Sequence, residues 1–395
     1  MRILQIVPSI SLIYGGPSQM VLGLAPALAR QGEEVTILTT DSNGDTGQEP
    51  LDVPLNRPIE QDGYQTIYFR CSPFRRYKFS LDLLKWLNQH AREYQLAHIH
   101  ALFSPVSSLA ATVCRRHKLP YILRPLGTLD PADLRKKRQL KQLYAAVLER
   151  PNIAGAAGIH FTSLQEAKVS ERFGVTTRDL VIPLGVIPPT SEGIAGGDGG
   201  SVVRQQLNIP TDVPLVLFMS RIDPKKGLEL LLPALEALLS EGLDFHFVLA
   251  GSNPQDLDYV EKIKSQVQSS PLRSRTTMTG FVTGELKTTL LQAADLFVLP
   301  SYYENFGIAV AEAMVSGTPV LISDGVHICQ EVRDSESGWV GTTDVSDLTM
   351  LLRITLQNPS ERQRRGLRAR EYALQHYSWD AIARETIQAY NQILS

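Results

Sequence analysis

Residues 295–320 read DLFVLPSYYENFGIAVAEAMVSGTPV and form the clearest strand–loop–helix pattern in the chain. The apolar run DLFVLP predicts a buried strand that ends at Pro300, and an apolar helix is expected from about Phe306 until just before Gly317. The loop between them is polar. In an open α/β sheet, the loop after a strand's carboxyl end lines the ligand crevice. The next helix offers free N–H groups and a positive dipole end, which suit a diphosphate.

Two glutamates in this stretch, Glu304 and Glu312, are eight positions apart. Eight helical residues rise about 12 Å, a reach that places one carboxylate at a sugar ring and the other at a ribose, with a diphosphate between them. Carboxylate oxygens accept hydrogen bonds from the paired hydroxyls of a polyol. The alternative is a solvated glutamate at each position. For Glu312 the alternative is weaker, because a charge in an otherwise apolar helix needs a partner.

Outward from this stretch, short apolar runs alternate with amphipathic segments along the whole chain. Strands are expected at or near 2–7, 34–40, 66–70, 97–101, 120–124, 158–162 and 180–183, and again at 214–220, 245–251, 276–280, 295–300 and 319–323. Buried strands separated by helices predict parallel sheets with helices on both faces. We therefore expect an α/β chain of two doubly wound, Rossmann-like domains that face a central cleft.

The domain boundaries are expected around the Gly/Pro-rich segment PPTSEGIAGGDGG (188–200). A segment of this composition reads as a linker. A last helix is expected from Trp379 to Leu394, with Ser378 as its N-cap. The predicted organisation is an N-terminal domain at 1–186, a linker at 187–202, a C-terminal domain at 203–375, and a C-terminal helix at 376–395 that braces the N-terminal domain.

Composition limits the functional classes. The chain has 395 residues, of which 43% are hydrophobic and 20% charged, as in soluble globular proteins of two domains. The net charge of -2 gives no general attraction to nucleic acid, and no nucleic acid partner is expected. The three cysteines have no paired spacing, which favours a reducing, cytoplasmic setting. No apolar run approaches the ~20 residues of a membrane span, so any membrane contact is expected to be peripheral.

Two further loops follow strands. The segment SRIDPKKG (220–227) places Arg221 and Lys226 after a strand, where such cations would stabilise charge that develops on a diphosphate leaving group. The alternative is a basic surface loop. Between the first strand and the first helix, Gly15 and Gly16 permit close backbone approach to a ligand. This loop is not G-x-G-x-x-G, which argues against a dinucleotide-binding oxidoreductase.

The histidines His98 and His100 end a predicted strand, and strand alternation puts them on one face. His100, at the strand end, is the candidate ligand contact, although a lone histidine is more often a satisfied structural residue. His160 and His246 lie within strands and are expected to be structural. The segment Asp256-Leu257-Asp258 has the D-x-D spacing of metal-dependent transferases, but it reads as the acidic first turn of a helix. No metal site is expected.

Residues 299–320, with their Phe-Gly and Gly-Thr-Pro-Val context, resemble the E-x7-E motif of the retaining glycosyltransferases of family 4, in particular those that build polysaccharides and glycolipids. The resemblance covers essentially the whole chain and implies the GT-B fold. It implies that Glu304 contacts the donor sugar and that Glu312 contacts the ribose. Family members often have Gly where this chain has Asn305, a departure that bears on loop shape and sugar preference.

The same resemblance assigns further roles. Arg221 and Lys226 match the diphosphate-binding R-x4-K, and His100 matches the histidine at the 6-position of the donor sugar. Together with Glu304, these are the expected catalytic residues. The remaining donor-site residues are Gly15, Gly16, Gly280, Phe281, Asn305, Phe306, Gly307, Ile308 and Glu312. The acceptor side is expected at Gly127, Thr128 and Asp130, although Gly-Thr and Asp-Pro are also ordinary turn sequences.

The implied reaction is metal-independent and cofactor-free transfer of a hexose, with retained configuration, from a nucleotide-diphosphate sugar. A UDP-sugar is favoured over a GDP-sugar, and the acceptor is a glycan, a glycolipid or another lipid-linked molecule, or a small molecule. A sugar-nucleotide epimerase of the GT-B fold and a non-catalytic nucleotide-sugar binding protein are the alternatives. The basic helix 133–150 implies peripheral contact with the inner face of a membrane, the alternative being a solvated helix face.

Overall fold

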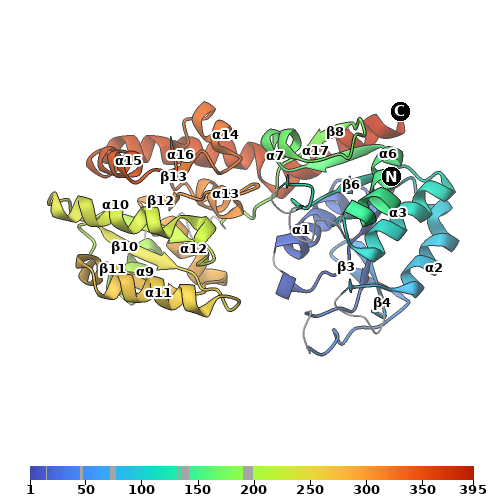
Figure 1. The fold of residues 1–395 in the computed structure, drawn as a ribbon, viewed down its shortest axis with the longest axis horizontal. Coiled ribbons are helices and arrows are strands. Elements are labelled where there is room, and N and C mark those ends of the chain that lie inside the picture. Colours follow the sequence, from blue (N-terminus) through green and yellow to red (C-terminus); the bar gives the residue numbers. More distant parts are fainter. Residues whose placement is uncertain (15, 45–47, 72–76, 132–133, 135–141, 190–198) are drawn as a thin grey trace. The chain divides into compact units, whose positions relative to one another are not determined.

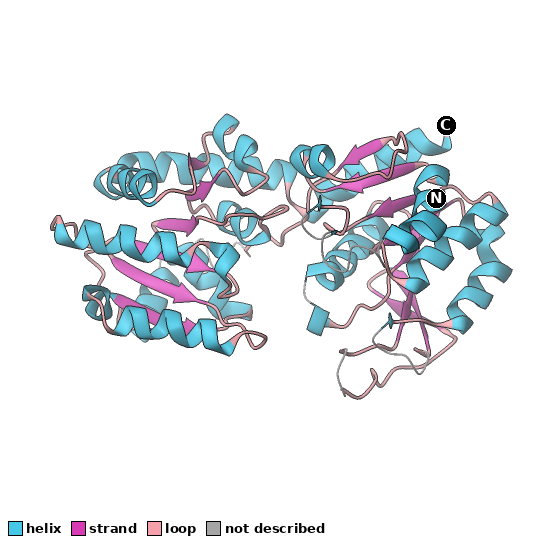
Figure 2. Ribbon diagram, in the orientation of Figure 1, coloured by secondary structure: helices cyan, strands magenta, loops and turns pink. Residues whose placement is uncertain are grey.

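A computed structural model of the chain describes residues 1–14, 16–44, 48–71, 77–131, 134, 142–189 and 199–395 (Figure 1). The chain divides into two compact units. Unit 1 comprises Met1–Gly185 and Trp379–Ser395, and unit 2 comprises Val186–Ser378. In each unit helices flank a mainly parallel sheet, as Figure 2 shows. The expected α/β class with two doubly wound sheets is therefore confirmed.

The sheet of unit 1 has the strand order β3-β4-β2-β1-β5-β6-β7-β8. Every neighbouring pair is parallel except β3 and β4, which form an antiparallel edge hairpin. The strands are β1 (Arg2–Ile6), β2 (Glu34–Thr40), β3 (Pro58–Gln61), β4 (Tyr64–Phe69), β5 (Leu96–His100), β6 (Tyr121–Arg124), β7 (Gly158–Phe161) and β8 (Asp179–Val181).

Helices cover both faces of this sheet because its central strands are apolar on both sides. In β1, Leu4 and Ile6 belong to one core cluster, while Ile3 belongs to the other. The helices of unit 1 are α1 (Gly16–Arg30), α2 (Leu81–His90), α3 (Pro105–His117), α6 (Arg150–Gly155), α7 (Leu164–Val169) and α17 (Trp379–Leu394). The last helix has the bounds that the sequence predicts, and it packs against α1.

Unit 2 has a six-stranded, fully parallel sheet in the order β11-β10-β9-β12-β13-β14. Its strands are β9 (Leu215–Met219), β10 (His246–Ala250), β11 (Thr276–Gly280), β12 (Leu296–Leu299), β13 (Val320–Ser323) and β14 (Gly338–Gly341). Its helices are α9 (Gly199–Gln206), α10 (Leu228–Ser240), α11 (Leu257–Gln268), α12 (Gly284–Ala293), α13 (Ile308–Val315), α14 (Cys329–Asp334), α15 (Val345–Gln357) and α16 (Pro359–His376).

The boundaries differ from the predicted ones around the Gly-rich segment. Helix α9 begins at Gly199, so the linker predicted at 187–202 extends too far into unit 2. Unit 2 also takes in Val186 before this segment and continues to Ser378, beyond the predicted end at residue 375. The backbone of Val186 pairs with that of Tyr377, which holds these two chain ends of unit 2 side by side.

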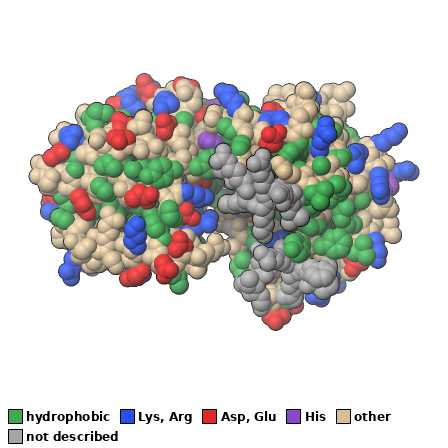
Figure 3. Space-filling view, viewed as in Figure 1, with side chains coloured by type: hydrophobic (Ala, Val, Ile, Leu, Met, Phe, Trp, Pro, Cys, Tyr) green, Lys and Arg blue, Asp and Glu red, His purple; other side chains and the backbone are tan. Residues whose placement is uncertain are grey.

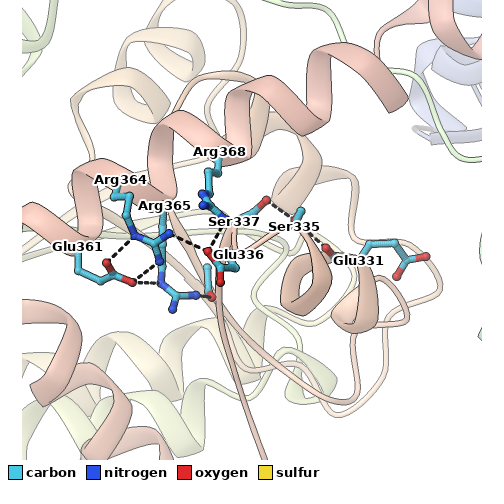
Figure 4. Close-up of polar contacts among 9 residues, drawn as sticks. Glu331, Ser335, Glu336, Ser337, Glu361, Arg364, Arg365 and Arg368 are labelled. Carbon is cyan, nitrogen blue, oxygen red and sulfur yellow. Dashed lines mark hydrogen bonds and ion pairs between the residues drawn. The ribbon is translucent and has the colours of Figure 1, made fainter.

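A network of arginines and glutamates ties α16 to the segment before β14. Arg364 donates to both Glu361 and Glu336, Arg365 donates to Glu361 and to the Gly338 carbonyl, and Arg368 pairs with Glu336 (Figure 4). Each guanidinium is therefore used within the network. On the face of unit 2 seen in Figure 3, Lys and Arg side chains are likewise interspersed with Asp and Glu side chains.

The predicted basic helix 133–150 lies partly outside the described residues, at 133 and 135–141, and Gly15 also lies outside them. Within this stretch the structure describes a helical residue 134, residues 142–144 and a π-helical turn at Ala145–Glu149 that leads into α6. None of the helices described is both long and apolar enough to cross a bilayer.

Candidate active site

The loop that leads from β12 to α13 carries Glu304, and backbone contacts hold it in place. The Glu304 N–H donates to the Gly325 carbonyl at 2.9 Å, and the His327 N–H donates to the Glu304 carbonyl at 3.0 Å. Gly307 ends the loop with φ +82, a left-handed conformation that suits glycine, immediately before the first residue of α13. The predicted strand–loop–helix pattern of residues 295–320 is thus confirmed.

Lys226 forms an ion pair with Glu304. Lys226 lies in the turn Pro224–Lys226 that follows β9, and β9 is the sheet neighbour of β12. The carboxyl ends of two adjacent strands therefore bring together two residues that are 78 positions apart. The Lys226 side chain is only 9% exposed, so its ammonium group is largely withdrawn from water and held by the carboxylate. An ammonium group donates to anions and a carboxylate accepts from hydroxyl groups, so the chemistry of this pair suits a ligand that carries both kinds of group.

Glu312 has the partner that its apolar helix requires. Lys287 of α12 donates to the Glu312 carboxylate at 2.5 Å, and both side chains are partly exposed. The sequence predicts that a charge at Glu312 needs a partner, but nothing in the sequence distinguishes Lys287 from the other lysines. Lys287 is therefore a residue of this site that sequence reasoning missed.

The other residues predicted for the donor site differ in how they are presented. Arg221 is exposed just after β9, and the Phe281 ring after β11 is 78% exposed. Asn305 accepts a hydrogen bond from the Tyr303 hydroxyl. Phe306 is different, because its ring is buried and packs edge-on against Tyr377 with 5.3 Å between ring centroids. Its side chain belongs to the core, and only its backbone lies near the start of α13.

Two more residues predicted for the donor site lie at the ends of elements. Gly280, with φ +70, ends β11, and Ile308 is the first residue of α13.

In unit 1, His98 and His100 lie on one face of β5, as alternation predicts, with ring centroids 4.6 Å apart. Both rings are almost fully buried. Burial and nearby positive charge lower the pKa of each well below 6.5, so both are neutral at pH 7. The Nε2 of His100 donates to Gln5 Oε1 at 2.8 Å, whereas its Nδ1 has no hydrogen-bond partner among the residues that the structure describes. His160 and His246 are also mostly buried and hydrogen-bonded, and burial lowers the pKa of both.

A cavity of about 320 Å³ lies in unit 1 beside the carboxyl ends of β1, β5 and β6. Three aromatic rings line it, from Tyr14, Tyr77 and Phe103. Lys78 also lines it and places its ammonium group 4.2 Å from the centroid of the Tyr14 ring. The buried hydroxyl of Ser104, another lining residue, has no hydrogen-bond partner among the described residues. Rings beside a cation and a hydroxyl suit a ligand with both apolar faces and polar groups.

The backbone around this cavity is unusual. Four of its lining residues that are not glycine have positive φ, namely Lys78 (46°), Ala101 (66°), Phe103 (57°) and Leu126 (57°). Such conformations cost energy for side chains with a Cβ and gather at binding sites.

The residues predicted for the acceptor side are not among those that line the cavity. Gly127, with φ +77, and Thr128, whose hydroxyl donates to the Pro125 carbonyl at 2.7 Å, form a turn after β6. Asp130 is buried below that turn. The predicted residues therefore shape the loop, and their neighbour Leu126 reaches the cavity. Gly16 is the first residue of α1.

The described residues also bear on metal binding. Among them, no three His, Cys, Asp or Glu side chains come together as they would around a metal ion. Asp256 caps α11 by accepting from the Tyr259 N–H at 3.1 Å, so the D-x-D segment begins a helix as expected.

Two doubly wound, mainly parallel sheets in one chain are typical of the GT-B class of fold, and in one of them Lys226 and Glu304 meet after the carboxyl ends of β9 and β12. Known proteins of that class match the whole chain. The structure is similar to that of sucrose-phosphate synthase from Thermosynechococcus elongatus, with a TM-score of 0.74, 24% identity, and coverage of 100% of this chain and 99% of that one. It is also similar to Anabaena HepE in complex with UDP and glucose, with a TM-score of 0.73, 20% identity, and coverage of 99% and 100%.

The sequence matches two families in succession. The glycosyl transferase 4-like domain matches residues 15–185, and glycosyl transferases group 1 matches residues 201–372. The two matched regions together cover most of the chain, which therefore belongs to this group of glycosyltransferases. The family and the class of enzyme that the E-x7-E segment indicates are confirmed. It is 27% identical to a D-inositol 3-phosphate glycosyltransferase of Nocardia farcinica, over 96% of this chain and 85% of that protein. It is also 27% identical to the alpha-D-kanosaminyltransferase of Streptomyces kanamyceticus, over 77% and 69%.

Proposed function

We propose that this enzyme transfers a hexose, with retained configuration and without a metal ion, from a UDP-sugar to a hydroxyl group of an acceptor. The observation that carries the proposal is the pair of carboxylates in the loop and helix after β12, each held by a lysine from another element of unit 2. Their spacing fits a sugar ring at Glu304 and a ribose at Glu312, with the diphosphate near the start of α13.

The role of the cations follows from the charge that develops during transfer. When the bond between sugar and diphosphate breaks, negative charge grows on the departing phosphate oxygens. Fixed cations stabilise that charge most when they are in place beforehand. Lys226 is held by Glu304, and Arg221 lies exposed five residues earlier. These two side chains supply the positive charge that a metal ion provides in other transferases.

Similarity supports the finer points of the proposal. HepE and an Escherichia coli trehalose-6-phosphate enzyme are solved with UDP or a UDP-sugar, which favours a uridine donor over a guanosine donor. Resemblance to the retaining family supports retention. We assign the acceptor to the aromatic-lined cavity of unit 1, and the inositol phosphate and sugar-modifying relatives favour a polyol or glycan. The three cysteines are free thiols, which is compatible with action in the cytoplasm.

Thermal stabilisation by nucleotides tests the donor site first. A ligand that binds only the folded state raises its stability. We expect UDP and UDP-glucose to raise the melting temperature and NAD to leave it unchanged. The Glu312→Ala variant should lose most of this shift. Glu261→Ala is the matched control, because Glu261 also pairs with a lysine but lies exposed on α11.

Product analysis then tests the reaction. With donor and an acceptor panel, the anomeric proton coupling of the product should show the configuration of the donor, and Glu304→Ala should abolish turnover. A changed sugar nucleotide formed without acceptor would identify an epimerase instead. Binding without any product from donor and acceptor would identify a sensor, and a shift with GDP alone would correct the donor base.

A further inference from the structure

A continuous chain of buried hydrogen bonds connects the last helix to His100 inside unit 1. It starts at the carbonyl oxygen of Ile182, just after β8, which lies 2.8 Å from Nε2 of His160. Nδ1 of His160 lies 3.2 Å from Nε2 of His98, and Nδ1 of His98 lies 2.8 Å from the hydroxyl of Tyr390 on α17.

The hydrogen bonds continue from Tyr390 to His100, the last residue of β5. The Nε2 amide group of Gln5 lies 3.1 Å from the Tyr390 hydroxyl, and Oε1 of Gln5 lies 2.8 Å from Nε2 of His100. Gln5 belongs to β1, which lies between β2 and β5 in the sheet. All of the side chains that take part in this series of hydrogen bonds are buried.

The direction of every hydrogen bond in this chain follows from its first member. A carbonyl oxygen only accepts, so His160 carries its proton on Nε2 and presents a lone pair at Nδ1. His98 must then donate from Nε2 and accept at Nδ1. The Tyr390 hydroxyl donates to that Nδ1 and accepts from the Gln5 amide group, which leaves the Gln5 carbonyl oxygen to accept from His100.

These hydrogen-bond directions hold only for neutral imidazoles, and the surroundings of the three rings keep them neutral. All three rings are buried, and the guanidinium group of Arg124 stands nearby. Burial first, and then the charge of Arg124, lower the pKa of His160 to about 3. Since each neutral imidazole has one N–H and one lone pair, a proton fixed at one end of the chain fixes the tautomer at the other end.

The chain of hydrogen bonds ends at a lone pair on the imidazole of His100. His100 carries its proton on Nε2, so its Nδ1 presents a lone pair, and this atom has no hydrogen-bond partner in the described structure. Arg124 is the register partner of His100 on the adjacent strand β6, and two of its buried guanidinium nitrogens, Nε and Nη1, also lack partners within the described part of the chain. A buried acceptor and a buried donor pair thus stand together at the carboxyl edge of the sheet, where α/β folds bind ligands.

We propose that Tyr390 is a positioning residue for catalysis: through Gln5 it fixes His100 as the Nε2–H tautomer, so that Nδ1 accepts a hydrogen bond from a sugar hydroxyl. The inference rests on the proposed function, in which His100 contacts the sugar. A hydroxyl group is the matching ligand, because an imidazole lone pair cannot bind a carbonyl or phosphate oxygen that has no proton. The C-terminal helix, which returns to unit 1 from the end of unit 2, thereby orients a residue of the active site.

Tyr390→Phe is the decisive variant, since it removes one oxygen atom and keeps the ring. Without that oxygen, His98 loses its donor and Gln5 loses the acceptor that holds its amide in one orientation. The amide is then free to turn, and His100 can bond to it in either tautomer. Tyr121→Phe is the matched control: Tyr121 is also a buried tyrosine of unit 1, but its hydroxyl donates to the Asn152 carbonyl at 2.7 Å, outside the chain.

Nitrogen-15 NMR of the imidazoles in the full chain reads the tautomers directly. In the native protein we expect His98, His100 and His160 to be neutral Nε2–H tautomers at pH 7, and the same in Tyr121→Phe. In Tyr390→Phe we expect His98 to stay the Nε2–H tautomer, because His160 still fixes it, and His100 to lose its single tautomer. The kcat of transfer should fall on the order of 10- to 100-fold, as when outer partners of a functional histidine are removed, while the affinity for UDP stays unchanged.

Several results would overturn the inference. If His100 of the native protein carries its proton on Nδ1, the derived hydrogen-bond directions are wrong. This measurement uses the native protein alone, so it does not depend on the folding of a variant. An unchanged His100 tautomer in Tyr390→Phe, or an unchanged kcat, removes the positioning role. If the native enzyme shows no transfer with any donor, the proposed function fails, whereas the tautomer spectra still decide whether the chain exists. Gln5→Leu serves as a second variant with the same expected results.

Discussion

At the scale of single residues, the three buried histidines of unit 1 make the stability of the protein depend on pH. Burial and the charge of Arg124 lower the pKa of His160 to about 3, whereas an unfolded histidine has a pKa near 6.5. Below pH 6.5 the unfolded chain therefore binds a proton that the folded chain does not. The contribution of His160 is complete above about pH 6.5 and is lost as the pH falls toward 3.

We expect His160→Gln to flatten this dependence. Each such histidine contributes a slope of at most about 1.4 kcal/mol per pH unit, so between pH 6 and pH 5 the variant should lose about 1 kcal/mol less unfolding free energy than the native chain. Urea denaturation at the two pH values measures the difference. Equal slopes in the two proteins would mean that His160 is already protonated in the folded chain, and that the tautomer argument for His100 begins from a wrong premise.

The partners of Glu304 and Glu312 show how much of the candidate site can be predicted from the sequence. The E-x7-E spacing and the cations after β9 are visible in the sequence, and the structure places Lys226 on Glu304. The partner of Glu312 was predicted to exist, but its identity as Lys287 depends on how α12 packs beside α13. Phe306 shows what the motif does not reveal: the position is predicted as a donor contact, but its ring packs on Tyr377 in the core, which leaves only its backbone for that contact.

At the scale of elements, α17 is fixed to unit 1 by a close fit around Trp379. The indole ring lies between Gly23 of α1 and Gly185, which follows β8. A Cβ atom added to either glycine would stand 2.2 Å from the ring. Glycine within a helix normally weakens it by about 1 kcal/mol relative to alanine. At Gly23 the missing side chain leaves room for the indole ring of Trp379, where α17 packs against α1.

Gly23→Ala should therefore destabilise the protein by about 1–3 kcal/mol, despite the better helix propensity of alanine. Gly16→Ala, also in α1, is the control for stability, since an added methyl group there meets no atom within 4 Å. In a Trp379→Ala background the cost of Gly23→Ala should vanish. If Gly23→Ala stabilises the protein with Trp379 in place, the proposed overlap with the indole ring is wrong. Urea denaturation of the native protein, the three single variants and the double variant measures these differences.

Elements with strong apolar runs were predictable, and those formed by local turn chemistry were not. The strands near 97–101 and 158–162 are found within a residue of their expected ends. The edge strand β3 was missed because its sequence, Pro58-Ile59-Glu60-Gln61, has no apolar run. Its signal is the turn Asp62-Gly63, where both residues have positive φ, as a tight hairpin requires.

At the scale of the whole molecule, the proposed chemistry is divided between the two units. The groups assigned to the ribose and the diphosphate, Glu312, Lys226 and Arg221, belong to unit 2, as does Glu304, which is assigned to the sugar ring. The His100 chain and the aromatic-lined cavity belong to unit 1. Each set is built within its own unit, from the carboxyl ends of that unit's own strands. Nucleotide binding should therefore be separable from turnover by substitution.

Calorimetric titration with UDP, together with turnover, tests this separation. Glu312→Ala removes hydrogen bonds to a charged group, which contribute roughly 1.5–3 kcal/mol, so the Kd for UDP should rise about 10- to 100-fold. His100→Ala should leave that Kd within about twofold while turnover falls, because its lone pair is assigned to the sugar. Tyr121→Phe should change neither quantity. A loss of UDP affinity in His100→Ala as large as that in Glu312→Ala would show that His100 in unit 1 holds the nucleotide, and that nucleotide binding and turnover are not separable in this way.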